Sequence, residues 1–420
     1  MDTSAADDHS DEPLTPVGRL LLQPEMNQII HCAMGFKNSI DIDAVKSHLK
    51  TSLLLSHPRF SSLMLRDSRG LQHWHNAPYV DLDRHIIVIQ NPVTTSPVDH
   101  ETAVNEYLAD LSTSSTRLSA NKPLWELHLL MAHNCGVFRI HHALGDGVSV
   151  MSLFLESFRT RGSDGNEEKI LGRGRRKRVN GEKGWWGLLI GYVGTLWFSL
   201  VFLVEHAMRS LWLCDQKTAI SGGEGVELWP RKLATARFRL QDMKLVKKAV
   251  PNAVSNSCLE SNSESSWGNK FGMFLLPIYY HKSSDLDPLV YLKRAKLVLD
   301  RKKQSLEADF SYKVGCFLIT YFGAKVASWL LYKMVCNTSF TISNILGPQE
   351  EIAIGGNLVT YLKVNTCSLP QALTMHMVSY AERADLQILV AKDIIPDPTF
   401  LAKCFEEALL DMKEAASSHE

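Results

Sequence analysis

The sequence lacks an excess of charge of either sign, because 45 Lys and Arg residues face 45 Asp and Glu residues. A protein that binds nucleic acid through its phosphates carries a surplus of basic residues, so nucleic acid is not an expected partner. Paired cysteines are missing as well: the eight cysteines are scattered singly, with no Cys-x-x-Cys. This distribution is typical of reduced thiols in a protein that faces the cytosol, and it argues against a disulfide scaffold.

The N-terminal stretch also lacks the apolar core of a signal peptide. Its sequence, MDTSAADDHSDE, is polar and acidic, so a cleaved signal peptide is not expected. Residues 1–12 are instead predicted to be a short disordered lead-in. No internal repeat is visible along the chain.

Residues 13–160 have the mixed composition of a globular region. Apolar residues at helical spacing follow Asp41, a residue type that caps helices. Strand-like runs begin at His85 and at Trp125, and the second is predicted to turn back on itself at residues 134–136. Because strand signals alternate with helix signals, the sequence predicts an α/β fold.

A second globular region is predicted over residues 222–420. Its pattern indicates a strand and a helix within 237–250 and a strand ending in a turn within 338–348. A hairpin is indicated within 372–393 and a closing helix over 398–416.

The most informative stretch is His141-His142-Ala-Leu-Gly145-Asp146-Gly147, between a strand-like run and an apolar, helix-like run. Asp146 is placed to cap the helix, and the glycines permit tight backbone geometry. A junction of strand and helix holds side chains rigidly, as chemistry requires. Imidazole, with an unperturbed pKa of ~6.5, can accept a proton near neutral pH and return it. A general base of this kind is worth roughly 10²–10⁴ in rate.

Two other interpretations of this motif stay open. It can be a capped helix with two incidental histidines. It can also bind metal, because His142 and Asp146 are four residues apart; however, no third ligand has matching spacing and the glycines favour a loop, so this is the weakest interpretation. The residues alone support the catalytic and the structural interpretation about equally.

Further motifs make a family resemblance specific. HHALGDG matches the HHxxxDG signature of acyl-CoA-dependent acyltransferases with the chloramphenicol acetyltransferase and condensation-domain fold. Around it stand EPLTPVGRL from Glu12, HPRFSSL from His57, LDRHII from Leu82, NKPLWELHLL from Asn121, SNILGPQEEI from Ser343, QALTMHMVSY from Gln371 and IPDP from Ile395. Over nearly its full length the sequence resembles the plant branch of the bifunctional wax ester synthase/diacylglycerol acyltransferase family. A sister family of plant acyltransferases carries a DFGWG motif that this sequence lacks.

The resemblance implies an α/β fold of two chloramphenicol acetyltransferase-like halves with a tunnel between them. It implies that His142 is the general base, which takes the hydroxyl proton of a long-chain alcohol or diacylglycerol, and that Asp146 is architectural. His141 is expected to pack or orient, and Gly147 to give the acyl chain or backbone room. The implied partners are acyl-CoA, the lipid acceptor and membrane lipid; no cofactor is implied, because acyl-CoA is a substrate. The leading hypothesis is therefore an O-acyltransferase that makes wax esters, triacylglycerol or both.

The family context also makes one turn a candidate wall of the acyl or CoA channel: Ser343, Asn344, Gly347 and Pro348. The simpler interpretation of these residues is a turn that ends a strand. His376 is interpreted as a strand histidine and Trp125 as core packing.

One segment departs from the family pattern. The family continues past residue 250 into an Asn-Asp motif and further strands, whereas this chain has PNAVSNSCLESNSESSWGN. A segment is thus missing near residues 252–261, and the second half is expected to be shortened. Loss of an oxyanion donor costs roughly 10²–10³ in rate, so the alternative hypothesis is a catalytically impaired, membrane-associated lipid-binding relative or a truncated splice or gene-model variant. A soluble enzyme with a small phenolic acceptor is disfavoured.

A membrane-associated helix is predicted between the two halves. Residues 161–184 form a charged, basic linker, and the next 20 residues, 185–204, carry no charge, enough for a helix of ~30 Å. The apolar helix is placed at residues 185–213. A single crossing would put the halves on opposite sides of the bilayer, so a hairpin or an interfacial helix is the alternative. The expected location is the endoplasmic reticulum membrane with both halves facing the cytosol, or else the plasma membrane.

Overall fold

The structure is a computed structural model of the 420-residue chain. It describes residues 12–77, 79–94, 98–113, 117–158, 207–250, 268–269, 272–273, 275–278, 287–304, 307–367 and 369–418, with a few positions between 193 and 205. The lead-in, the basic linker, most of the apolar segment 185–213 and the missing-segment region 252–261 lie outside the described residues.

The larger sheet has six strands in the order β10-β11-β2-β7-β6-β5. They are β2 (Ile29–Phe36), β5 (Ile86–Ile89), β6 (Trp125–Leu130), β7 (Cys135–His141), β10 (Ala353–Ile354) and β11 (Asn357–Thr366). Every pair is antiparallel except β5 with β6. The hairpin predicted from Trp125 is confirmed as β6–β7, and Asn134 turns it with a φ of 45°.

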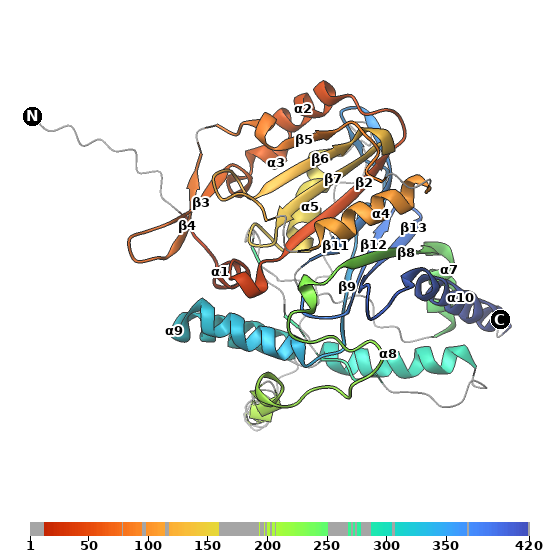
Figure 1. Cartoon of the computed structure of the whole chain (residues 1–420). Coiled ribbons are helices and arrows are strands. Elements are labelled where there is room, and N and C mark those ends of the chain that lie inside the picture. The colour runs from red at the N-terminus through yellow and green to blue at the C-terminus, as the bar shows by residue number, and fades with distance from the viewer. Residues whose placement is uncertain are drawn as a thin grey trace, which may run out of the picture.

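Helices cover both faces of this sheet (Figure 1). They are α2 (Ile42–Thr51), α3 (Leu53–Ser56) and α5 (Gly147–Phe158) on one face and α4 (His100–Leu111) on the other. As predicted, Asp41 caps α2: its Oδ1 accepts from the backbone N–H groups of Asp43 and Ala44, both at 3.0 Å. Trp125 is fully buried and stacks on the Phe138 ring, which confirms its place in the core.

The second sheet has four strands in the order β8-β13-β12-β9. They are β8 (Arg231–Arg239), β9 (Phe340–Ile345), β12 (Leu373–Tyr380) and β13 (Arg383–Ala391); β9 and β12 are parallel and the other pairs antiparallel. The closing helix α10 (Pro398–Ser417) packs on its outer face, beside α7 (Leu240–Ala249). The strand, helix and hairpin predicted for this region are thereby confirmed.

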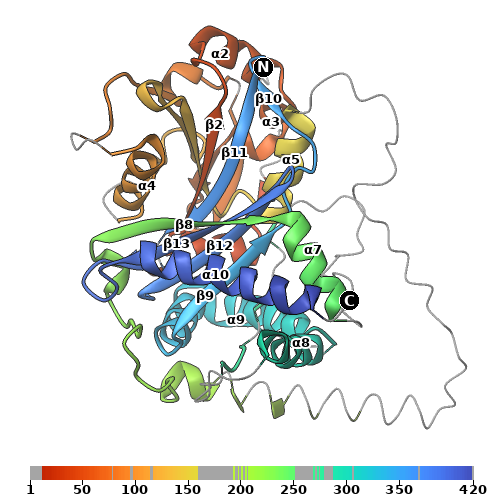
Figure 2. The same ribbon diagram turned by 90° about the vertical axis from the view of Figure 1, so that its right-hand side faces the viewer.

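The two sheets are interlocked by β11 (Figure 2). This strand comes from the C-terminal part of the chain, yet it pairs with β2 along most of its length, from Val359 opposite Phe36 to Thr366 opposite Ile30. It is a ten-residue strand whose last residues are all buried. The inner face of the second sheet therefore lies against the first sheet, and the histidine motif at the end of β7 faces this junction.

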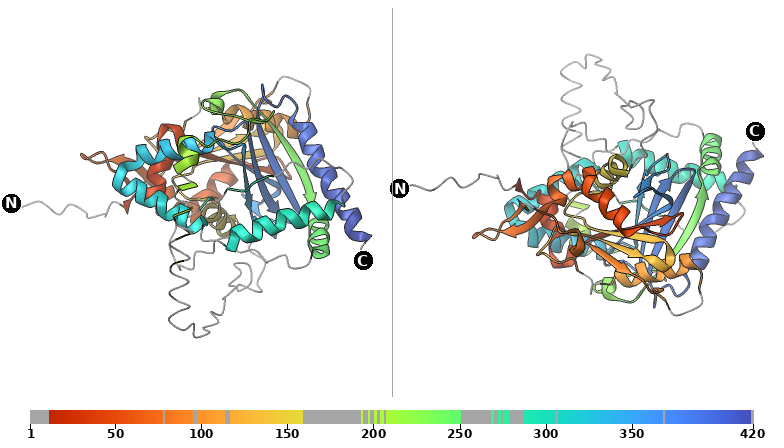
Figure 3. Two further views of the ribbon diagram at one scale, coloured as in Figure 1. Left: turned by 90° about the horizontal axis from the view of Figure 1, so that it is seen from below. Right: turned by 90° about the horizontal axis from the view of Figure 1, so that it is seen from above.

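The remaining elements are a small sheet of β1 (Glu12–Pro13), β4 (Gln72–Asn76) and β3 (Ser62–Arg66), the helix α1 (Pro16–Leu21), the short 3-10 turns η1 (Pro24–Met26), η2 (Pro58–Phe60), η3 (Leu82–Arg84), η4 (Met131–His133) and η5 (Val226–Leu228), and the helices α8 (Pro288–Gln304) and α9 (Glu307–Cys336). In Figure 1 the small sheet and α1 lie on the left, and α8 and α9 lie on the lower side. Seen from below, α8 and α9 lie nearest the viewer (Figure 3). The long apolar helix that the structure describes is α9, which sequence analysis did not anticipate.

Candidate active site

The histidine motif stands where β7 ends and α5 begins. The backbone N–H of His141 donates to the Leu124 carbonyl at 3.0 Å, and that of His142 donates to the Gln28 carbonyl at 2.9 Å. The segment before β6 thus fixes the backbone of His141, and the segment before β2 fixes the backbone of His142. The alternation of a strand means that the two rings leave the backbone in different directions.

The ring of His141 is locked and neutral. Its Nδ1 accepts from the backbone N–H of Ala143 at 3.1 Å, so its Nε2 carries the proton and donates to Asn27 Oδ1 at 2.7 Å. Burial, with a smaller contribution from His142, lowers the pKa of His141 to about 3. Both ring nitrogens are engaged in hydrogen bonds within the fold, which suits a residue that orients the motif.

Asp146 and Gly147 join the motif to the following helix. Asp146 caps α5: its Oδ1 accepts from the Ser149 N–H at 2.8 Å, and its carbonyl accepts from the Val150 N–H at 2.9 Å. A Cβ at Gly147 would lie 2.8 Å from Ile345 Cδ1. The absence of a side chain at Gly147 therefore lets β9 of the second sheet approach the motif.

Asn269 fixes which nitrogen of His142 carries the proton. Asn269 is 1% exposed; its Nδ2 donates to the Ala143 carbonyl at 3.4 Å, which turns its Oδ1 toward His142 Nδ1 at 3.0 Å. The backbone carbonyl of His142 also accepts from this ring. Two acceptors on the Nδ1 side place the proton on Nδ1, so Nε2 is the nitrogen with the lone pair.

The electrostatic surroundings of His142 favour the neutral ring. Burial lowers the pKa of His142 below its ordinary value, whereas its own carbonyl, Asn269 and the carboxylate of Asp146 oppose that fall. At neutral pH the ring is therefore unprotonated at Nε2 and able to accept a proton. Asn269 was not predicted from the sequence; the Gly-Asn pair is its only signal there, since Gly268 adopts a φ of 146°, which favours glycine.

Variants of Asn269 are expected to move the pH profile of any activity that uses His142 as a base. A histidine base acts when it is neutral, so such a rate falls as the pH drops through the pKa of the ring. Asn269→Asp adds a negative charge beside Nδ1 and should move this acid limb of kcat/KM to higher pH. Asn269→Leu removes an acceptor and should move it to lower pH, with kcat about tenfold lower for one lost hydrogen bond.

The measurement is kcat/KM against pH for these variants and for Asn105→Asp. Asn105 is a matched control, because it is buried too but its Nδ2 donates to Thr235 Oγ1, at the contact of α4 with β8. An acid limb that stays in place in both Asn269 variants would contradict the assigned tautomer.

The second sheet contributes a row of polar residues that has His376 at the motif and Thr235 at the contact with α4. The strand register aligns Ser343, His376, Gln387 and Thr235 across β9, β12, β13 and β8. Burial, with a smaller contribution from His142, lowers the pKa of His376 to about 4, and its Nε2 lies 3.0 Å from Thr366 Oγ1. Among the described residues, neither Nδ1 of His376 nor Oε1 of Gln387 has a hydrogen-bond partner. His376 is thus a strand histidine that also borders the candidate site.

The structure separates the four candidate channel residues. Ser343 shares the inner face of the sheet with Ile345, whereas Asn344 is exposed on the opposite face. The Gly347 N–H donates to Ser379 Oγ at 3.2 Å, and a Cβ there would lie 2.2 Å from the Ser379 carbonyl. Pro348 accepts from the Ala381 N–H at 2.8 Å. Of the four, Ser343 is the one whose strand position places it beside the motif.

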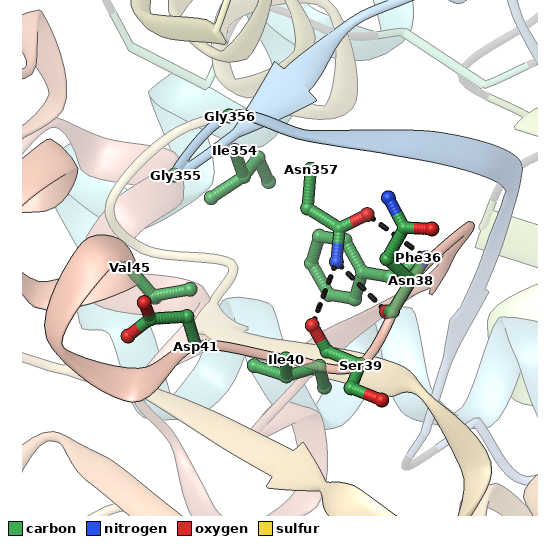
Figure 4. A pocket seen from close by; sticks show the side chains of 10 residues that line it. All are labelled: Phe36, Asn38, Ser39, Ile40, Asp41, Val45, Ile354, Gly355, Gly356 and Asn357. Carbon is green, nitrogen blue, oxygen red and sulfur yellow. Dashed lines mark hydrogen bonds between the residues drawn. The ribbon is translucent and has the colours of Figure 1, made fainter.

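A hollow of about 160 Å³ lies elsewhere, between the turn after β2 and the β10–β11 turn (Figure 4). In it, Asn357 Nδ2 donates to the carbonyls of Asn38 and Ser39. The histidine motif lies beside the first residue of β2, and the hollow lies beside its last residue. Because a strand rises ~3.3 Å per residue, the hollow and the motif are roughly 20 Å apart.

Within the described part of the chain no cluster of three His, Cys, Asp or Glu residues could hold a metal ion.

Comparisons with known sequences agree on one family. The family model described as the wax ester synthase/diacylglycerol acyltransferase catalytic domain matches residues 40–256, and the WS/DGAT C-terminal domain matches residues 267–413. Wax ester synthase/diacylglycerol acyltransferases 5 and 11 of Arabidopsis thaliana are each 30% identical, over 97% and 96% of this chain and 94% and 95% of theirs. The first alignment runs over 485 positions, more than the 420 residues of this chain, so this relative holds segments that the chain lacks.

Comparisons with solved structures agree on the fold. The wax ester synthase/diacylglycerol acyltransferase from Marinobacter aquaeolei superposes with a TM-score of 0.57 at 14% identity, covering 96% of this chain and all of that one. The trichothecene 15-O-acetyltransferase from Fusarium sporotrichioides gives a TM-score of 0.57 at 13% identity, covering 96% and 95%. At these identities the likeness supports the α/β fold.

Proposed function

Because the chain belongs to the wax ester synthase/diacylglycerol acyltransferase family and is an acyltransferase, we propose that His142 is its general base. The acceptor is the hydroxyl of a long-chain alcohol, of diacylglycerol or of both, and the donor is acyl-CoA. The observation that carries this assignment is the pair of acceptors on the Nδ1 side of His142, Asn269 Oδ1 and the ring's own carbonyl. They leave the lone pair on Nε2, where a base needs it.

The proposed reaction proceeds without a covalent enzyme intermediate. His142 Nε2 takes the hydroxyl proton as the acceptor oxygen attacks the thioester carbonyl carbon, which gives a tetrahedral oxyanion and an imidazolium. The oxyanion collapses, the carbon–sulfur bond breaks, and the CoA sulfur takes the proton back from Nε2. The products are the ester and free CoA, so proton and electron pairs balance without any cofactor.

The other motif residues support this base in the proposal. Asp146 holds the start of α5 through its cap. Its carboxylate also stabilises the imidazolium, because its charge acts against the fall that burial causes in the pKa of His142. His141 keeps the motif oriented through Asn27. The lack of a side chain at Gly147 leaves room for Ile345 of β9. Ser343, also on β9, is the residue proposed to form part of the wall of the acyl or CoA channel.

A membrane location follows from the substrates. Long-chain alcohols and diacylglycerol dissolve in lipid, whereas acyl-CoA approaches from water. We propose that the enzyme works at the cytosolic face of the endoplasmic reticulum membrane, with the plasma membrane as the alternative. The described part of the chain has one stretch, Phe310–Cys336, that is long and apolar enough to cross a membrane by length and composition.

The direct test is ester formation by the full chain. Membranes from host cells that make no neutral lipid are supplied with labelled acyl-CoA and either hexadecanol or dioleoylglycerol. Labelled wax ester or triacylglycerol is expected, with one CoA thiol released per ester, and the ratio of the products gives the acceptor preference. Release of CoA without ester would indicate hydrolysis and contradict the proposal.

The shortened chain gives a second candidate function, a catalytically impaired lipid-binding relative. The observation that favours it is the length of the alignment with the Arabidopsis relative, which exceeds this chain. In that case the chain forms no ester in the same assay, and inserting the segment of a relative after Val250 restores it. Activity in the chain as it stands excludes this candidate.

A further inference from the structure

Helix α9 lies on the lower side of the molecule in Figure 1 and carries exposed apolar side chains. One side of this helix packs on α1: Ile319, Ala327 and Tyr332 of α9 are buried with Leu20 and Leu21. Its other side presents five large apolar residues, each between 43% and 72% exposed: Phe317, Tyr321, Phe322, Val326 and Trp329. Helix faces of soluble proteins rarely expose so many aromatic residues together, so this one marks an interaction surface.

The geometry of α9 favours a helix that lies along a bilayer and does not cross it. Gly323 has φ 85° and ψ 160°, which breaks the helix into two arms. Each arm is shorter than the ~20 residues that a crossing needs. Lys313 and Lys325 are exposed on these arms. An interfacial helix, in contrast, buries only one apolar face at the level of the headgroups.

The neighbouring helix α8 supplies positive charge on the same side of the molecule (Figure 3). Its sequence, PLVYLKRAKLVLDRKKQ, contains six basic residues and one acidic residue. Lys293, Arg294 and Arg301 are exposed, and Leu297 between them is 66% exposed. Lys293, Leu297 and Arg301 are spaced four apart and so share one face. A basic face with an apolar centre complements anionic lipid headgroups.

Residues 207–213 extend the apolar surface at the end of α9. Met208, Leu211 and Trp212 are 42%, 55% and 73% exposed. The stretch is fastened to α9, because Asn337 Nδ2 donates to the carbonyl of Arg209. An exposed tryptophan is typical of the membrane–water interface.

We propose that α8, α9 and residues 207–213, here called the docking face, bind the surface of a bilayer that contains anionic lipid. This proposal depends on the proposed function in one respect. Both place the enzyme at the membrane, where the lipid acceptor is dissolved. Exposed lysines favour a bilayer over a second protein, because the cores of protein interfaces are depleted in lysine. Of the docking face, α8 and α9 are separate in sequence from the predicted apolar segment 185–213, whereas residues 207–213 are the end of that segment.

The experiment is sedimentation of the full chain with vesicles of phosphatidylcholine, with and without phosphatidylserine. All proteins carry His142→Gln, so binding is measured without turnover and a failed acyltransferase assay leaves the result standing. A charge variant combines Lys293→Glu with Arg294→Glu. An apolar variant combines Tyr321→Ser, Phe322→Ser and Trp329→Ser.

Each variant has a distinct expected effect. The charge variant should bind anionic vesicles more weakly, by about fivefold or more per reversed charge, and bind neutral vesicles as before. The apolar variant should lose about tenfold or more on both vesicle types. Two matched controls should bind like the parent: Arg66→Glu with Arg69→Glu on the exposed β3–β4 turn, and Phe400→Ser on α10.

A photoactivatable phospholipid distinguishes the docking face from the apolar segment 185–204. After irradiation of the bound parent, adducts are expected in peptides from α9 and from residues 207–213. Adducts confined to 185–204, or unchanged affinity in both variants, would refute the proposal. Concentration-dependent dimerisation that the apolar variant abolishes, without vesicle binding by the parent, would assign the face to a second copy instead.

Discussion

Changing His142 to glutamine is expected to lower the rate of ester formation by roughly 10²–10⁴-fold. Glutamine can still donate to Asn269 Oδ1, but its amide nitrogen has no lone pair that accepts a proton near neutral pH. The acceptor hydroxyl must then attack without a base. KM for acyl-CoA should change little, because the substitution removes an interaction made as the proton moves and leaves the binding surfaces in place.

The measurement is the initial rate of labelled ester formation, with His75→Gln as the matched control. His75 is an exposed histidine on β4 of the small sheet, so the same chemical change there should leave the rate unaltered. The unfolding midpoint of His142→Gln should stay close to that of the parent, because glutamine has a similar size and can keep the hydrogen bond to Asn269. A folded variant that retains the parent rate would remove His142 from the mechanism.

The second large effect is a loss of folding stability in mild acid. Four histidines with a lowered pKa are at least 96% buried, and burial, the largest cause in each, lowers their pKa to about 3 for His31 and His141 and to about 4 for His85 and His376. The unfolded chain binds their protons near pH 6.5, whereas the folded chain does so only at these lower values. Stability is therefore complete above pH 6.5 and falls as the pH drops from 6.5 toward 4.

The slope follows from the number of protons involved. Each such histidine contributes about 1.4 kcal/mol per pH unit, so four remove roughly 6 kcal/mol per unit. Domains are stable by about 5–15 kcal/mol, and most of this margin is lost within a few pH units. Denaturant unfolding at a series of pH values measures the slope. His31→Gln should lower the slope by about one quarter and His75→Gln should not; equal slopes in parent and His31→Gln would contradict the assignment.

Local patterns in the sequence predicted the elements whose causes are local. The Asp41 cap, the β6–β7 hairpin and the helix that starts after Asp146 each depend on residues within one turn or one strand pair. The apolar helix α9 was missed because its apolar residues point in all directions and Gly323 interrupts it, so no amphipathic period is visible. The place of β11 depends on pairing with β2, more than 300 residues earlier, which no local pattern encodes.

The candidate site also contains residues that a local sequence pattern predicts and residues that only the folded chain brings together. His142 was predicted because the whole motif lies within seven consecutive residues, and its glycines and aspartate have local structural causes. Asn269 is 127 positions away from His142, and only the folded chain brings its amide to the ring. His376 carries no sequence signal beyond its strand, yet the register of β12 with β9 and β13 places it beside the site.

The pairing of β11 with β2 also decides when this protein can first be complete during synthesis. β2 ends at residue 36, but the strand that covers its edge ends at residue 366 of 420. For most of translation the edge of β2 opposite β7 has no neighbour, and open strand edges invite intermolecular pairing. Nascent chains halted before β11 should therefore need chaperones and aggregate without them, and expressing the two halves as separate polypeptides should fail unless they are made together.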